Sequence, residues 1–383
     1  MTDQLSEDDF RLRARAFFAE EVTADVREKL ADGGSEFVES FHRRLGADGW
    51  IASQWSIEHG GGGGTQREGA ILQEEAAFAG APMLASNLSS IVGFALIEHA
   101  SPSMVEAYLP GFASGETVVC LGYSEPEVGS DLASLTTRAA RDGDDWIISG
   151  SKMWTSLAQV ADYMLCACRT DPETDRHTGI SMFLVPMEHI AVEPVMTLGS
   201  FRTNITFLDD IRVSQDNMVG KLHGGWQILM SALDFERAGT CTARVGQARR
   251  VLALTWRALE ESGQLDRLER ERDELADLTA GLTSTAELAY RVADMQAQGM
   301  RCPAESSIAK VAGTELLQRA TDLSLRLLGP IGLLSRGAPG AFANGELELE
   351  HRNAVRYTVT AGTNEIQRNI IAKHGLGLGG SRR

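Results

Sequence analysis

The sequence predicts an α+β protein, mostly α-helical, in which a small β domain lies between two helical regions. The hydrophobic residues recur with a helical period from Asp9 to about residue 113 and with a strand-like period from about residue 116 to residue 212. They become helical again after Gly224-Gly225. The chain has 383 residues, of which 43% are hydrophobic, so it is long enough for two or three domains and is not globally disordered. The predicted domains are therefore residues 1–116, 117–224 and 225–383.

The first of these regions is predicted to be helical. Ile71, Leu72, Ala76 and Phe78 recur at helical spacing, and Thr65 stands just before them. A threonine in that place is typical of a helix N-cap, because its hydroxyl can accept from a free backbone N–H of the first turn. We therefore expect a helix that begins directly after Thr65.

The middle region is predicted to form short strands. The candidates are residues 117–121, 135–141, 146–148, 163–168, 180–185 and 205–208. Between the second and third of them, Asp142-Gly-Asp-Asp145 has the composition of a hairpin turn. Because no helical pattern separates the strands, the region is predicted to be an antiparallel barrel or sandwich.

The last region is predicted to be a bundle of long helices. The candidates are residues 226–261, 265–298, 303–327 and 363–374. Pro303 suits the first turn of a helix, and Gly329-Pro330 suits the end of one. Four helices without intervening strands favour a four-helix bundle.

Composition excludes several classes of function. With 36 basic and 53 acidic residues the formal net charge is −17, which opposes binding to nucleic acid and adsorption to anionic membranes. No apolar run approaches the roughly 18 residues that a transmembrane helix needs, and the first residues do not resemble a secretory signal. The five scattered cysteines are typical of reduced thiols in a cytoplasmic protein, and Cys166-Ala-Cys168 has no partner pair that would predict a metal site.

Two neighbouring segments contain candidate ligand-binding residues. Gly122-Tyr-Ser-Glu-Pro-Glu-Val-Gly-Ser-Asp131 combines hydroxyls with glycines that allow close backbone approach, and Lys152-Met-Trp-Thr-Ser156 places a tryptophan between short donors. A planar side chain flanked by hydroxyls suits a flat heteroaromatic ligand with carbonyls and ring nitrogens. The same residues also fit a core tryptophan beside a polar turn, and the residues alone favour that simpler interpretation. Walker, Rossmann, Gly-x-Ser-x-Gly and His-Glu-x-x-His motifs are missing from the sequence.

Taken together, five segments resemble the acyl-CoA dehydrogenase family, and the match runs over nearly the whole chain. They are Gly122 to Asp131, Lys152 to Ser156, Arg202-Thr-Asn204 through Arg212-Val213, Leu233-Asp-Phe-Glu-Arg237, and Ala361-Gly-Thr-Asn-Glu-Ile-Gln-Arg368. Val128 departs from the first signature, where a small residue is usual. The resemblance implies the acyl-CoA dehydrogenase fold, with an N-terminal helical domain, a middle β-barrel or sandwich and a C-terminal four-helix bundle.

The resemblance implies that FAD is the cofactor and assigns residues to it. Ser124 would bond the pyrimidine end of the flavin. Ser130, on the same loop as Gly129, would lie near both the flavin and the acyl-thioester arm of the substrate. Trp154 would pack on the isoalloxazine, with Ser156 near its N5.

The C-terminal part of the chain would contribute further cofactor contacts. By the same resemblance, Thr363 and Glu365 would approach the FAD. Gly329 falls where a glycine pair of a neighbouring subunit usually meets the FAD, but its companion here is Pro330, which donates no N–H.

The catalytic base is where the sequence departs from the commonest family members. Those enzymes carry a glutamate immediately before Gly-Thr in the C-terminal signature, and here that residue is Ala361. In the isovaleryl-type enzymes the base comes from the first bundle helix, just before an arginine, and Glu236-Arg237 matches that alternative. The resemblance therefore implies Glu236 as base, with Arg237, Ala361 and Ser130 near the substrate. Taken alone, Glu236 would be interpreted as a solvated or ion-paired helix carboxylate.

The assembly is left open between two forms. Family homotetramers usually carry an Arg-x-x-Phe-Gly run after the first bundle helix, and residues 258–265 have none. In lacking this run, the chain resembles subunits of bacterial heterotetrameric acyl-CoA dehydrogenases, including those that act on sterol side chains. The implied partners are an acyl-CoA substrate, an external electron acceptor such as an electron-transfer flavoprotein, and either identical subunits or a paralogue. The alternatives are a non-catalytic or half-site subunit, a flavin oxidase or monooxygenase, and a dehydrogenase of carrier-protein-bound acyl groups.

Overall fold

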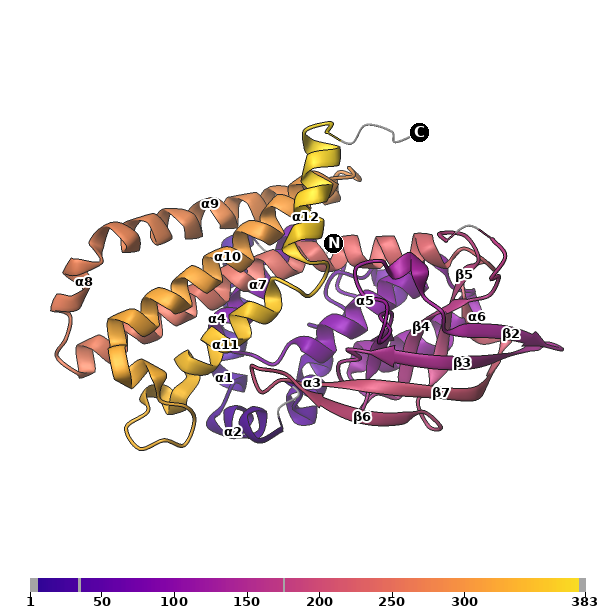
Figure 1. Ribbon diagram of the computed structural model, residues 1–383, viewed down its shortest axis with the longest axis horizontal. Helices are drawn as coiled ribbons and strands as arrows, with labels where there is room; N and C mark the ends of the chain where they lie inside the picture. Colours follow the sequence, from indigo (N-terminus) through magenta and orange to yellow (C-terminus); the bar gives the residue numbers. More distant parts are fainter. Residues whose placement is uncertain (1–5, 34–35, 175, 379–383) are drawn as a thin grey trace.

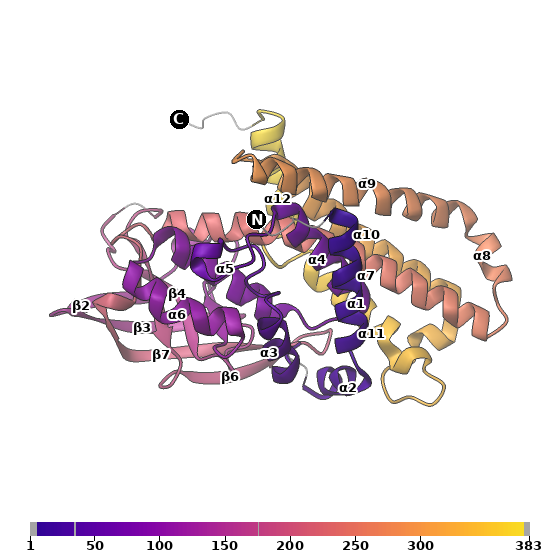
Figure 2. The ribbon, with the colours of Figure 1, turned by 180° about the vertical axis from the view of Figure 1, so that it is seen from behind.

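The computed structural model describes residues 6–33, 36–174 and 176–378, with the side chains of residues 31–33 and 233–238 left undescribed. The sheet lies at one end of the molecule and the long C-terminal helices at the other, while helix α7 (Gly225–Glu261) extends along both (Figure 1). The N-terminal helices pack across the junction and stand in front in the reverse view (Figure 2). The predicted order of helical, β and helical parts is confirmed.

The N-terminal helices begin and end at residues suited to those positions. They are α1 (Glu7–Glu21), α2 (Ala24–Gly33), α3 (Glu39–Ala47), α4 (Gln66–Ala79), α5 (Leu84–His99) and α6 (Pro102–Ser114). The Thr65 hydroxyl accepts from the backbone N–H of Glu68, and the Glu68 carboxylate accepts from the N–H of Thr65 at 2.6 Å. This capping box confirms the predicted start of α4. The helix ends at Gly80, whose φ of 74° is readily adopted by glycine.

The strands of the described residues form one mixed sheet in the order β6-β7-β3-β2-β4-β5-β8, with β1 added beside β4. Their bounds are β1 Val119–Gly122, β2 Arg138–Asp142, β3 Asp145–Met153, β4 Tyr163–Arg169, β5 Ile180–Pro186, β6 Ala191–Met196, β7 Arg202–Ser214 and β8 Met218–Val219. Asp142 pairs with Asp145, which confirms the predicted hairpin turn.

The sheet differs from the sequence prediction in two respects. The prediction of purely antiparallel pairing is wrong, because β1 and β2 each pair with β4 in parallel. The β2–β3 hairpin stands between β1 and β4 in the chain, and this longer connection lets β4 return in the direction of β1. Strand β6 was not predicted. Most of its side chains are exposed and it contains Pro194, so it lacks a buried hydrophobic pattern.

The C-terminal helices are α7, α8 (Asp266–Arg270), α9 (Arg272–Ala297), α10 (Pro303–Leu328), α11 (Glu346–Tyr357) and α12 (Asn364–Ile370). The single helix predicted over 265–298 is broken at Glu271, where φ is −107° and ψ is 20°. Helix α11 was not predicted, and it follows a glycine-rich stretch that conceals its start. Helix α12 is shorter than predicted and continues as one π-helical turn over Ile371–Gly375.

Helix α7 connects the parts of the molecule, since it packs against α4, α10 and β5. Glycines allow two of these close approaches. A Cβ at Gly246 would lie 2.2 Å from the carbonyl oxygen of Glu74 in α4, and one at Gly225 would lie 2.9 Å from the backbone of Ser181 in β5. We propose domain limits at 1–116, 117–224 and 225–383, because the strands span Val119 to Val219 and α7 begins at Gly225.

Candidate active site

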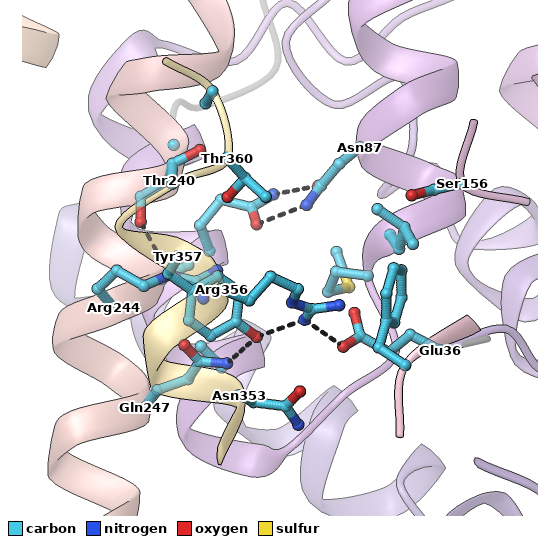
Figure 3. A pocket seen from close by; sticks show the side chains of 18 of the residues that line it. Glu36, Asn87, Ser156, Thr240, Arg244, Gln247, Asn353, Arg356, Tyr357 and Thr360 are labelled. Atoms are coloured by element: carbon cyan, nitrogen blue, oxygen red, sulfur yellow. Dashed lines mark hydrogen bonds and ion pairs between the residues drawn. The ribbon is translucent and has the colours of Figure 1, made fainter. Parts of the chain in front are cut away.

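A cavity of about 1410 Å³ lies where the N-terminal helices, the sheet and the C-terminal helices meet. It brings together most of the residues expected to bind cofactor and substrate, although they come from distant parts of the chain. Those that line it are Ser124, Gly129, Ser130, Trp154, Ser156, Ala361 and Thr363. Figure 3 shows Asn87 and Ser156 on one side of the cavity and Thr240 and Thr360 on the other.

Two other expected residues do not line the cavity, and two more have side chains that the structure does not describe. Glu365 lies in the first turn of α12, where its side chain is 80% exposed. Gly329 ends α10, next to a separate hollow of about 500 Å³ that its neighbours Leu328 and Ile331 help to line. Glu236 and Arg237 fall within α7, but their side chains lie outside the described residues.

Trp154 has the geometry of a ligand-facing residue rather than a core residue. Its side chain is 53% exposed, and its φ of 63° is costly for a residue with a Cβ. The backbone holds it there from both sides. The N–H of Met153 donates to the carbonyl of Ser124 at 2.9 Å, and the N–H of Thr155 donates to the carbonyl of Asn204 at 3.0 Å. Strain of this kind at a cavity wall is common at binding sites.

A buried ion pair fixes the loop that carries Ser124. The Lys152 ammonium donates to Glu125 Oε1 at 3.0 Å and to the carbonyl of Tyr123 at 3.1 Å, and its side chain has no exposed surface. Glu125 also accepts from the backbone N–H groups of Thr136 and Thr137. Burial by itself raises the pKa of Glu125, but Lys152 and these hydrogen bonds lower it to about 2. Each charge is therefore compensated and the loop is rigidly placed.

These residues fit a flavin. The half-exposed indole of Trp154 offers a flat face, and a Cβ at Gly129 would meet only open space, so a ring can approach the loop. Among the described residues, no protein hydrogen bond occupies the hydroxyls of Ser124 and Ser156. Free hydroxyls beside an open aromatic face match the carbonyls and ring nitrogens of an isoalloxazine.

The segment that contains Ala361 is held from outside the cavity. Lys310 of α10, only 1% exposed, donates to Asn364 Oδ1 at 2.8 Å and to the carbonyl of Thr358 at 3.3 Å. The amide of Gln367 donates to the carbonyls of Ala361 and Gly362, each at 3.3 Å. Ala361 adopts a φ of 54°, and no acceptor within the described part of the chain takes its backbone N–H. That N–H remains available to a ligand.

A polar network closes the part of the cavity between α7, α11 and the segment after α2. Tyr357 Oη accepts from Gln247 Nε2 at 3.2 Å and from Arg356 Nη2 at 2.9 Å. Arg356 also donates to the Glu36 carboxylate at 2.6 Å, and the Arg244 guanidinium stacks 3.4 Å from the centroid of the Tyr357 ring. Figure 3 shows Arg244, Gln247 and Tyr357 close together, with the Arg356 guanidinium extending from them to Glu36.

Glu350 of α11 also lines the cavity and has a perturbed acidity. Burial, and then the neighbouring charges of Glu346 and Glu36, raise its pKa to about 7, against the opposing effect of Arg244 and Arg250. Its Oε2 atom has no hydrogen-bond partner among the described residues. Glu350 is therefore largely protonated at mildly acidic pH.

Sequence reasoning missed the residues that hold the site in place. Lys152 and Lys310 are the clearest signals available, because each is a single cation within a segment that is otherwise apolar or small. Their partners Glu125 and Asn364 lie inside recognised motifs, but the contacts with the two lysines depend on the tertiary fold. In the portions of the chain that the structure describes, no cluster of His, Cys, Asp or Glu could hold a metal ion. No helix in those portions is long and apolar enough to cross a membrane.

Comparison with protein families accounts for this architecture. The acyl-CoA dehydrogenase N-terminal domain matches residues 5–116, the middle domain residues 120–207 and the C-terminal domain residues 223–376. Acyl-CoA dehydrogenase FadE26 of Mycobacterium tuberculosis is 35% identical, and the match covers 97% of each chain. The chain belongs to the acyl-CoA dehydrogenase family. This membership makes it an oxidoreductase, and the family is FAD-dependent.

Further relatives match nearly the whole chain. Acyl-CoA dehydrogenase IpdE1 of Mycobacterium tuberculosis is 31% identical over 97% of each chain. Among solved structures, the steroid acyl-CoA dehydrogenase Tcur3481-Tcur3483 has 32% identity and a TM-score of 0.89 over the full length of both chains. The ChsE4-ChsE5 complex from Mycobacterium tuberculosis has 33% identity and a TM-score of 0.87, again over the full length of both chains.

Proposed function

We propose that this acyl-CoA dehydrogenase binds FAD and catalyses α,β-dehydrogenation of an acyl-CoA thioester, with Glu236 as the catalytic base. The observation that carries the proposal is the cavity itself, which joins three walls. Trp154 and the serines form one, the Ala361 segment forms the second, and the inner face of α7 forms the third. Family membership supports the reaction type, and Glu236 stands on the third wall's helix.

Helical periodicity supports the choice of position 236. Thr240, Ala243 and Gln247 line the cavity, and they follow position 236 by four, seven and eleven residues. Residues at those spacings share one face of a helix. This spacing supports the proposal that Glu236 shares the stripe of α7 that faces the cavity.

The chain's own groups supply the remaining chemistry. Removing the α-proton of a thioester requires one positioned carboxylate, which is the role proposed for Glu236. The N–H of Ala361 can donate to the thioester carbonyl and stabilise the negative charge that develops there. Ser124, Ser156 and Trp154 would orient the flavin. Bound FAD supplies the hydride acceptor for the β-carbon, and an external carrier takes up the electrons.

The proposed assembly is a tetramer, either of identical chains or with a paralogue. Residues 258–265 lack the Arg-x-x-Phe-Gly run, and Gly329 is followed by Pro330, so the far end of the bundle is poorly equipped to complete a neighbour's FAD site. This favours the mixed form, and a non-catalytic or half-site subunit is the alternative function. The flavin-to-chain ratio separates them. A ratio near one for protein expressed alone supports the homotetramer, and a ratio near one-half with a co-purified paralogue supports the mixed form.

The test of the base is Glu236→Gln, which keeps the size of the side chain but removes the proton acceptor. Flavin bleaching by acyl-CoA in stopped flow should slow by at least about a hundredfold, the low end of general-base effects, while FAD content and substrate binding persist. Glu260→Gln is the matched control, because Glu260 is an exposed glutamate of the same helix outside the cavity. Bleaching at the wild-type rate in Glu236→Gln would contradict the proposal.

Two further variants test where the base lies. Ala361→Glu in the Glu236→Gln background should recover part of the rate, since it returns a carboxylate to the opposite wall. Glu350 is an unpaired carboxyl with a pKa of about 7 in the same cavity. If Glu350→Gln slows bleaching a hundredfold and Glu236→Gln does not, the base is Glu350.

A further inference from the structure

Part of the cavity wall carries polar atoms that the protein leaves without partners. Buried atoms of five lining residues make no hydrogen bond with any described residue. They are Arg244 Nη1, Arg356 Nε, Gln247 Oε1, Asn353 Oδ1 and Glu350 Oε2. Each such atom costs free energy unless a ligand or water satisfies it, and five on one wall are more than packing explains.

Charge is also uncompensated at this wall. Arg250 pairs with Glu346 at 2.5 Å, and Arg356 pairs with Glu36 at 2.6 Å. Arg244 contacts no carboxylate among the described residues. Its Nε donates to the carbonyl of Thr240 at 3.4 Å, and its guanidinium group stacks on the ring of Tyr357. A partly buried guanidinium with a free N–H favours an oxygen acceptor, above all an anionic one.

The position of Arg244 on α7 sets how far this wall lies from the reacting carbons. Residue 244 follows residue 236 by eight positions, a rise of about 12 Å along the helix axis. An extended acyl chain of the substrate spans that distance in about ten carbon–carbon bonds. The polar wall therefore lies at the depth that the far end of a medium-length or multi-ring acyl group would reach.

We propose that this wall binds an oxygen function at the far end of the acyl group, so that the substrates are acyl thioesters with a distal carboxylate, ketone or hydroxyl. The proposal rests on the proposed function, because it assumes that the thioester end lies at Glu236 and Ala361. Arg244 contributes the free cationic donor. Gln247, fixed by its bond to Tyr357, presents a neutral acceptor that a hydroxyl could use.

The test compares three acyl-CoA substrates of equal length with the purified flavoprotein: dodecanoyl-CoA, 11-oxododecanoyl-CoA and the mono-CoA ester of dodecanedioic acid. We expect kcat/KM for at least one oxygenated chain to exceed that of dodecanoyl-CoA by tenfold or more. Arg244→Met should reduce this ratio at least fivefold. Arg291→Met, which removes an exposed arginine of α9 outside the cavity, should leave the ratio unchanged. A wild-type ratio near one, or a ratio that Arg244→Met does not lower, overturns the proposal.

A binding measurement separates this proposal from the proposed function. Thioether analogues of the same three chains cannot be dehydrogenated through a thioester enolate, and calorimetry gives their dissociation constants. If an oxygenated analogue binds tenfold more tightly than the unsubstituted one, and Arg244→Met loses this difference, the proposed oxygen-binding role of this wall is supported. If, in addition, no substrate bleaches the flavin, only the proposed dehydrogenase function fails. If all three analogues bind equally well and dodecanoyl-CoA bleaches the flavin, only the proposal that this wall binds a distal oxygen is overturned. If Arg244→Met does not fold, Gln247→Leu serves in its place.

Discussion

Two walls of the same cavity differ in how their buried charged side chains are paired. On the Trp154 side, Lys152 and Glu125 are buried, paired at 3.0 Å and further bonded to backbone groups. On the Arg244 side, five residues keep buried polar atoms unpaired. Internal pairing fixes a loop in one geometry, whereas unpaired groups leave binding capacity for a ligand. This difference agrees with the roles that we propose for the two walls, which are to position the cofactor and to recognise part of the substrate.

The largest expected effect comes from breaking the paired wall. Lys152→Met leaves the Glu125 carboxylate buried without its counter-charge, which should cost about 3–5 kcal/mol of unfolding free energy. The loop that carries Ser124 should also become less rigid, so FAD content should fall. Chemical denaturation and the absorbance ratio of flavin to protein measure the two effects. Adding Glu125→Gln to Lys152→Met should restore part of the stability, and a double variant no more stable than Lys152→Met would argue against the ion pair as the cause.

The same pair predicts how stability depends on acidity. The pKa of Glu125 is lowered to about 2 in the folded chain, and its ordinary value is 4.5. Its ionised form therefore stabilises the fold at pH above about 4.5, and this contribution is lost as pH falls from 4.5 towards 2. A shift of this size corresponds to a difference on the order of 3 kcal/mol. The stability difference between wild type and Glu125→Gln should shrink over that window, and a difference that is constant with pH would contradict it.

Glu350, on the Arg244 side of the cavity, should give stability the opposite dependence on pH. Glu350 has a pKa of about 7 when folded and an ordinary value of 4.5, so the fold holds its proton more tightly than the unfolded chain does. The wild type should lose stability relative to Glu350→Gln as pH rises from about 4.5 to 7, and the difference should then stay constant. A shift of this size again corresponds to a difference on the order of 3 kcal/mol. Chemical denaturation of both proteins at pH 5 and pH 8 tests this prediction. If the stability difference between wild type and Glu350→Gln were the same at both pH values, the prediction would be wrong.

The smallest effect concerns the backbone at Trp154. Both Trp154→Ala and Trp154→Gly remove the ring that would pack on the flavin, so both should lower FAD occupancy. Glycine tolerates the φ of 63° and alanine does not, so Trp154→Gly should be more stable than Trp154→Ala by about 1 kcal/mol. Unchanged FAD occupancy in both variants would remove Trp154 from the proposed flavin site.

The sequence by itself determined the order of helical, strand and helical parts and the starts of several helices. Hydrophobic periodicity and capping are local properties, so Thr65 predicts the start of α4 and the Asp142 turn predicts a hairpin without any long-range contact. Motifs in family-like order also identified segments whose residues line the cavity. Ser124, Trp154 and Thr363 are far apart in the chain, and all three line one cavity.

Only the tertiary structure decided how those segments are held and what the cavity can recognise. The pairing of Lys152 with Glu125 and of Lys310 with Asn364 joins residues 27 and 54 positions apart, and no local pattern encodes such contacts. The parallel pairing of β1 with β4 and the existence of α11 likewise depend on packing. Arg244 is an ordinary helix arginine in the sequence. It becomes a candidate substrate contact only because folding buries it beside Tyr357 and gives its counter-charges to other residues.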